Sequence, residues 1–179
     1  MDSELVTFSP EALPRELYLI GFRLDPASEG ADFYTLMGDQ GESERPIMRS
    51  GRVLLFRKPL DGLKALMASD NGFSDVRPVP KELELLCDIS GALYVANAEA
   101  ADSEGVLFET IAVFDDLLRA VELSVPEAYA TVLSAVAGRL TENPEFENFL
   151  AERKLTRESL EDALMWCVGA VIVKSSWIE

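Results

Sequence analysis

The chain has 179 residues and a mass of 19.7 kDa, with 48% apolar and 27% charged side chains. This composition excludes collagen-like, low-complexity and strongly disordered proteins, and the length suits one domain or two small ones. A chain of this size buries about 70% of its unfolded surface, so it needs no structural metal or disulfide. It contains no histidine, which excludes a Ser–His–Asp triad and deprives a cysteine nucleophile of its usual base.

The net charge is strongly negative and unevenly distributed. Thirty-two acidic and 16 basic side chains give a formal charge of −16. Residues 1–80 carry 13 acidic and nine basic groups, so most of the excess lies in residues 81–179. Such a charge repels nucleic acid backbones and anionic membranes, and we expect neither as a partner. It fits either a basic protein partner or a simple solvated acidic surface.

Two cysteines, Cys87 and Cys167, lie in apolar stretches that we expect to be helical. We expect free buried thiols rather than a disulfide. Two cysteines without histidine cannot complete a standard four-ligand zinc site. The chain also lacks the G-x-x-x-x-G-K-[ST] and G-x-G-x-x-G motifs that bind phosphates and dinucleotides. The sequence therefore indicates no metal and no cofactor.

The chain shows no targeting or membrane signal. Residues 1–4 are acidic and lack the basic region of a signal peptide. The longest apolar run, Ala163 to Val173, has 11 residues with Gly169 included. Because a membrane span needs about 20 such residues, this run predicts a buried core helix. We expect a cytoplasmic protein.

Strand-forming residues dominate the first part of the chain. Residues 16–24 and 33–37 predict two strands, and Ser50-Gly51 predicts a tight hairpin between short strands at 46–48 and 53–56. Pro59 opens a predicted helix over 60–69, on which Leu63, Leu66 and Met67 share a face. A final edge strand is expected over 73–79.

Beyond Pro80 the apolar residues recur at helical spacing. Helices are expected over residues 83–93, 107–121, 127–140, 145–152 and 157–171. Ser124 and Glu127 fit a capping box at the start of the third of these helices. Asn143 and Thr156 are the expected caps of the last two.

These elements predict an α+β fold. A mainly antiparallel N-terminal sheet with one helix is followed by a helical C-terminal half. The expected boundaries are 1–80 for the sheet module and 81–179 for the helical bundle region. The second region either forms its own unit or packs with the first as one compact unit.

The most unusual local feature is a run of five basic groups without an acid among them, in an otherwise acidic chain: Arg45, Arg49, Arg52, Arg57 and Lys58. Guanidinium groups suit carboxylates and phosphates, so these residues are a candidate anion-binding site. The competing interpretation is charge balance against acidic helices of the same chain or of a second subunit. In a regular strand Arg45 and Arg49 share a face, whereas Arg52 and Arg57 point to opposite faces.

Two further features have both a structural and a functional interpretation. Trp177, two residues from the end of the chain, either docks back onto the fold or anchors a partner. The acidic groups Asp115 and Asp116, and Glu158, Glu161 and Asp162, are better explained as solvated surface than as acid–base pairs. Asp102 to Gly105 does not complete the ligand spacing of an EF-hand.

The absence of catalytic motifs favours a non-enzymatic protein. We expect a protein-binding or regulatory module, of the immunity or inhibitor type, that neutralises a basic partner by charge complementarity. The alternative is a small-ligand binding domain in which the arginine-rich hairpin holds an anion. A homo-oligomer is compatible with either hypothesis.

Overall fold

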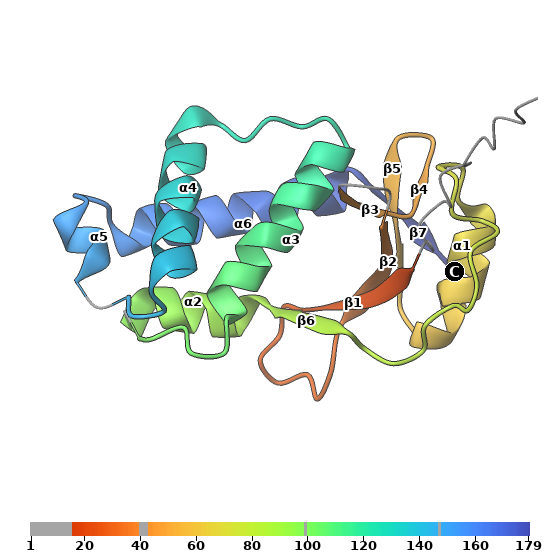
Figure 1. Ribbon diagram of the computed structural model, residues 1–179, viewed down its shortest axis with the longest axis horizontal. Coiled ribbons are helices and arrows are strands. Elements are labelled where there is room, and N and C mark those ends of the chain that lie inside the picture. The colour runs from red at the N-terminus through yellow and green to blue at the C-terminus, as the bar shows by residue number, and fades with distance from the viewer. Residues whose placement is uncertain (1–15, 40–42, 99, 147) are drawn as a thin grey trace, which may run out of the picture.

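The computed structural model describes residues 16–179 apart from 40–42, 99 and 147. A seven-stranded mixed sheet lies at one end of the molecule and most of the helices lie at the other (Figure 1). The strands are β1 (Leu17–Arg23), β2 (Phe33–Asp39), β3 (Glu44–Pro46), β4 (Met48–Arg49), β5 (Arg52–Phe56), β6 (Leu85–Asp88) and β7 (Ser175–Ile178). The α+β class predicted from the sequence is therefore confirmed.

The sheet has the order β4-β5-β2-β1-β6, with β3 paired to β2 and β7 paired to β5. The pairs β1–β6 and β5–β7 are parallel, and the other pairs are antiparallel. The predicted hairpin joins β4 to β5. Its two turn residues, Ser50 and Gly51, have φ values of 51° and 71°, which the tightest two-residue hairpin turns require.

The helices are the 3-10 turn η1 (Pro59–Asp61) and the α-helices α1 (Gly62–Ala68), α2 (Ile89–Ala98), α3 (Val106–Ala120), α4 (Glu127–Glu142), α5 (Phe149–Glu152) and α6 (Arg157–Val173). Helices α3 and α6 contact each other and each contacts both α2 and α4, and α6 runs behind α3 and α4 in Figure 1. Among the described residues, no helix combines the length and the apolarity needed to traverse a bilayer.

Strand alternation divides the apolar side chains of the sheet between two hydrophobic clusters. Phe22 and Leu55 belong to the larger cluster, which also contains the buried side chains of α2, α3, α4 and α6. Leu36 and Leu54, on the other face, pack in the smaller cluster with Leu66 of α1. The larger cluster includes residues from both sides of position 80. The proposed boundary at that position stays a prediction.

The C-terminal region is less purely helical than predicted, because both β6 and β7 come from it. Cys87, expected on a helix, lies in β6, where the backbone pairs in parallel with β1. A short run of apolar residues in a sequence fits a buried strand as well as a buried helix. The predicted strand over 73–79 is also wrong, since those residues form turns and irregular backbone.

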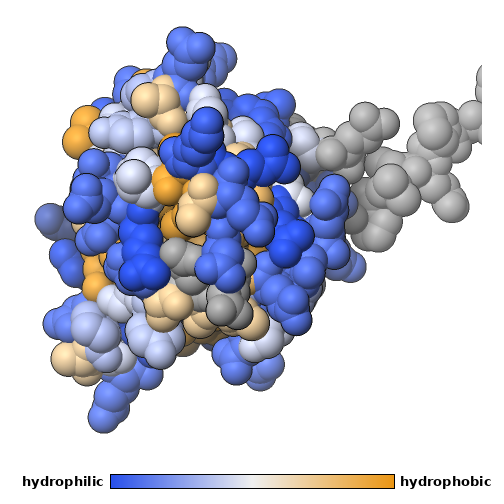
Figure 2. All heavy atoms as spheres, turned by 90° about the vertical axis from the view of Figure 1, so that its left-hand side faces the viewer, coloured by the Kyte–Doolittle hydropathy of each residue, from blue (hydrophilic) through white to orange (hydrophobic). Residues whose placement is uncertain are grey.

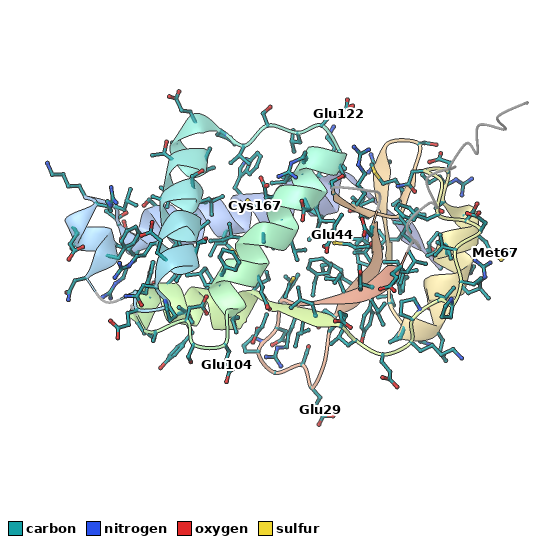
Figure 3. The ribbon with its side chains drawn as sticks, viewed as in Figure 1. Glu29, Glu44, Met67, Glu104, Glu122 and Cys167 are labelled. Atoms are coloured by element: carbon teal, nitrogen blue, oxygen red, sulfur yellow. The ribbon has the colours of Figure 1, made fainter. Side chains whose placement is uncertain are left out.

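Three local predictions about the helices are corrected. Asn143 does not cap a helix over 145–152, because it is the C-cap of α4 and α5 begins only at Phe149. On α1, Leu66 is buried, whereas Leu63 and Met67 are exposed, and Figure 3 shows Met67 pointing outward. The capping box at Ser124 is wrong, because the N-cap of α4 is Pro126, without a side-chain cap. The cap at Thr156 is confirmed, and Ser159 completes its capping box.

Candidate functional site

The basic run is divided by the sheet. Arg49 lies opposite Arg52 in the hairpin, so both are on the face that carries Leu54 and α1. Arg57 contacts the ring of Trp177, which pairs with Leu55 on the other face. As the alternation rule predicts, Arg52 and Arg57 are on opposite sides of the sheet.

Two of the five basic groups bind the C-terminal segment of the chain itself. Arg52 donates from Nη2 to the carbonyl oxygens of Val173 at 2.8 Å and Ser175 at 2.7 Å. Its Nε donates to the Ser176 hydroxyl at 3.0 Å. Because carbonyls at a helix C-terminus attract cations, Arg52 ties the end of α6 to the hairpin.

The other three basic groups, Arg45, Arg49 and Lys58, are exposed, and no hydrogen bond or ion pair joins their side chains to another described residue. The five side chains thus do not converge on one point. The anion-binding hypothesis stays a prediction that this geometry does not favour.

Trp177 docks onto the fold and keeps 39% of its surface exposed. Its ring meets that of Phe33 edge-on, with 5.5 Å between ring centroids. The Arg57 guanidinium lies 4.7 Å from the centre of the Trp177 ring, in cation–π geometry. The docking that the sequence suggested is present, and the exposed part of the ring leaves its role as an anchor an open prediction.

Both cysteines are free and buried, as expected. Burial raises the pKa of Cys87 to about 12 and that of Cys167 to about 11. A thiol with such a pKa is almost fully protonated at neutral pH and is a poor nucleophile. Among the described residues, no cluster of three or more acidic or cysteine side chains could hold a metal ion.

Carboxylates gather where the sheet meets α3. Glu44 lies between the sheet and α3 in Figure 3. Glu44 is exposed, and partial desolvation of its carboxyl beside α3, followed by the nearby charges of Asp116 and Asp39, raises its pKa. Burial also raises the pKa of Asp116, although Arg119 opposes this shift from 3.1 Å away. Arg119 bonds to Asp115 as well, so one cation serves two carboxylates.

Asp102 has a role that the sequence analysis missed. Its carboxylate is buried and accepts hydrogen bonds from the backbone amides of Leu107 at 3.1 Å and Phe108 at 2.9 Å. Asp102 therefore caps α3 in front of Gly105, which has a φ of 72°. The signal in the sequence was an aspartate a few residues ahead of an apolar helical stripe.

An apolar groove separates α3 from α4 and has a volume of about 260 Å³. Its walls include Phe108, Ala112 and Asp115 of α3 and the facing residues Ala130, Leu133, Ser134 and Ala137 of α4. Leu164 and Cys167 of α6 form its floor, and Cys167 lies between α3 and α4 in Figure 3. A second hollow, which shares Asp115, Leu118 and Val125 with the groove, is lined further along by Arg119 and Glu122.

The surroundings of the groove are acidic. The segment from α3 to the end of α4, Val106 to Glu142, carries six acidic and two basic side chains. Asp115 at the rim is exposed, and Glu122 stands at the top end of α3 in Figure 3. Hydrophilic side chains cover most of the end of the molecule seen in Figure 2, with apolar ones near its centre and scattered towards its edges.

Comparisons with protein-family models, curated proteins and solved structures find no match for this chain.

Proposed function

We propose that the protein is a non-enzymatic binding module whose α3–α4 groove receives a basic amphipathic segment of another protein. The observation that carries this proposal is an apolar floor in a groove whose rim holds Asp115, which is bonded to Arg119, and, further along, the exposed Glu122. Helix-in-groove recognition uses such a floor to bury apolar anchors, and charges at the rim select the partner and orient it.

The shape of the groove follows from local structure. The connection between α3 and α4, residues 121–126, contains Pro126 and lets the two helices diverge. Because α4 packs on α6, α6 closes the bottom of the space between them. Side chains of moderate size from a partner helix fit a hollow of about 260 Å³.

The charge supports an inhibitor-like or immunity-like role. A partner that carries lysine and arginine gains long-range attraction from a chain of net charge −16. The attraction speeds encounter, while the apolar floor slows dissociation. We place this activity in the cytoplasm, where two unpaired thiols would stay reduced.

Photo-crosslinking from inside the groove tests the proposal. A photoreactive amino acid replaces Ser134, and a second version replaces Ala98, an exposed alanine of α2 outside the groove. We expect the Ser134 probe to capture in native cells a protein crosslinked through a segment with basic and apolar residues at helical spacing. The Ala98 probe should not capture it.

A groove-filling variant supplies the matched control. Ala112→Trp places a ring at the mouth of the groove, and Ala98→Trp adds the same ring elsewhere. The first change should abolish the Ser134 crosslink, and the second should leave it. Capture through an acidic segment, or capture that is unaffected by Ala112→Trp, would refute the proposal.

A further inference from the structure

A second apolar groove lies beside α1, at the end of the molecule opposite α4 and α5 (Figure 1). It has a volume of about 430 Å³, and Pro59, Leu60 and Leu63 form one side of it. The segment 77–81 forms the other side. Leu60 is 75% exposed and Leu63 is 46% exposed, so the fold leaves much of this apolar surface in contact with water. Among the described residues, this α1 groove and the α3–α4 groove share none.

The charge around the α1 groove is opposite to that of the whole chain. Residues 45–81 carry eight basic and three acidic side chains, within a chain of net charge −16. Arg77 and Lys81 line the groove, and no acidic residue of the described part of the chain does. Arg77 donates to the carbonyl oxygens of Ser74 and Val76, which carry no net charge. An apolar segment that carries acids is therefore the complementary occupant.

The chain itself contains such a segment ahead of β1. Residues 1–15 precede the described part of the chain, and the first 14 of them include three acidic side chains and no basic one. Apolar residues follow the first two acids, at Leu5, Val6 and Phe8. The segment 2–8 thus combines acids that suit the cations of the groove with apolar side chains that suit its walls.

The start of β1 brings this segment within reach of the groove. Strands β1 and β6 are parallel, and the Glu84 amide, just before β6, donates to Leu19 O at 3.0 Å. Glu16 and Lys81 each lie three residues ahead of one of these partners, at the same end of the pair. At about 3.3 Å per residue, both lie within about 10 Å of this hydrogen bond. The seven residues 9–15 span up to about 25 Å, which is enough to bring Phe8 to the groove.

We propose that residues 2–8 occupy the α1 groove of their own chain. The apolar side chains of this segment cover Leu60 and Leu63, and its acids lie among the cations of residues 77–81. A tether of this length gives an effective concentration on the order of millimolar, so the contact forms without high intrinsic affinity. The occupied groove is closed to other proteins until a competitor displaces the segment. This proposal does not depend on the α3–α4 groove or on what that groove binds.

Photo-crosslinking within the full chain tests the proposal. Benzoylphenylalanine replaces Phe8, and the purified protein is irradiated at about 1 µM, where the tether favours contact within one chain over contact between chains. We expect mass spectrometry to find residue 8 joined to a peptide of the same chain that contains 59–63 or 77–81. A crosslink between two chains, a crosslink to another face, or no crosslink at all would overturn the proposal.

Two exposed apolar residues near each other provide a matched pair of variants. Leu60→Glu puts a carboxylate into the groove and should lower the crosslink yield more than about fivefold, because a charge would be buried against apolar side chains. Met67, on α1, is 68% exposed but does not line the groove. Met67→Glu should therefore leave the yield within about twofold of the parent. Equal effects of the two changes would refute the assignment of the groove.

Reversal of one charge tests the electrostatic part of the contact. Lys81→Glu replaces a cation of the groove by an acid and should lower the crosslink yield, as should salt of about 0.5 M in the parent. Lys154→Glu makes the same change beside α5, at the far end of the molecule in Figure 1, and should not lower it. A yield that is insensitive to Lys81→Glu, or equally sensitive to Lys154→Glu, would count against the proposal. Circular dichroism of each variant confirms that the fold is intact.

Discussion

At the scale of single residues, the buried carboxylate of Asp102 and the surface carboxylate of Glu44 both affect stability. Asp102 satisfies two backbone amides at the start of α3 and is itself held by a hydrogen bond from its own amide to Pro144 O at 2.9 Å. In the sequence, the segment from Asp102 to Gly105 was compared only with the calcium-binding loop of an EF-hand, whose ligand spacing it does not complete. Its capping role could not be assigned because the distance from Asp102 to the first helical residue depends on the turn that contains Gly105.

Asp102→Ala should lower the free energy of unfolding by about 1–2 kcal/mol, because two amides at a buried helix end lose their acceptor. Urea denaturation followed by circular dichroism measures the change. Glu104→Ala removes an exposed acid two residues away and should change stability little. An Asp102→Ala variant as stable as the parent would show that α3 does not need this cap.

Glu44 should make stability dependent on pH. Its pKa is raised in the folded protein, mainly by partial desolvation of the carboxyl and then by Asp116 and Asp39. The folded state therefore favours the protonated form, and stability falls as pH rises through the folded-state pKa. Glu44→Gln removes the carboxylate and should stabilise the protein at pH 7.

The advantage of Glu44→Gln should vanish below about pH 4, where the parent carboxyl is protonated in both states. Thermal denaturation of both proteins between pH 3.5 and about 7.5 measures this convergence. Glu29→Gln, in the loop between β1 and β2, is the control and should show no such pattern. A Glu44→Gln variant that is less stable at pH 7 would contradict the assigned sign.

At the scale of elements, helix and strand periodicity predicted most segments, and tertiary contacts decided the exceptions. The strands at β1 and β2 and the hairpin at Ser50-Gly51 follow from strand formers and turn residues in the sequence. The strand β6 was missed because Leu83, Leu86 and Ile89 recur at helical spacing across it. Its conformation depends on pairing with β1, more than 60 residues earlier, which a local pattern does not contain.

The two candidate capping boxes provide a matched pair of tests. Thr156 accepts from the Ser159 amide at 3.0 Å, whereas Ser124 makes no cap at α4. Thr156→Ala should cost about 0.5–2 kcal/mol, and Ser124→Ala should stay within about 0.5 kcal/mol of the parent. Urea denaturation of both variants compares them directly. Equal effects would contradict the assignment of the caps.

At the scale of the whole molecule, the sequence predicted the α+β class and the acidic character of the helical half. It did not predict which apolar side chains would remain open. Ala163 to Val173 indicated a core helix, yet its outward side faces solvent, because α2, α3 and α4 cover only the other side. The α3–α4 groove could not be predicted from the sequence either, because its lining residues come from three different helices.

The basic residues between Arg45 and Lys58 were recognised in the sequence, but their partners in the fold were not. Composition singled them out, but the fold assigns Arg52 to the carbonyls at the end of α6 and Arg57 to the Trp177 ring. A cluster of charges in a sequence does not show which of the charged groups will bind other parts of the same chain. We therefore look for the surface offered to another protein where apolar side chains lie in a segment with more acids than bases, which is the α3–α4 groove.

The most direct test of the proposed groove is NMR mapping with two designed peptides. One amphipathic helix combines leucine with lysine, and its matched counterpart combines leucine with glutamate. We expect the lysine peptide to shift amide signals of α3, α4 and residues 164–167, with weaker binding at higher salt and none in Ala112→Trp. Equal binding of the glutamate peptide, or shifts confined to other faces, would contradict the assignment of this groove as a site for basic partners.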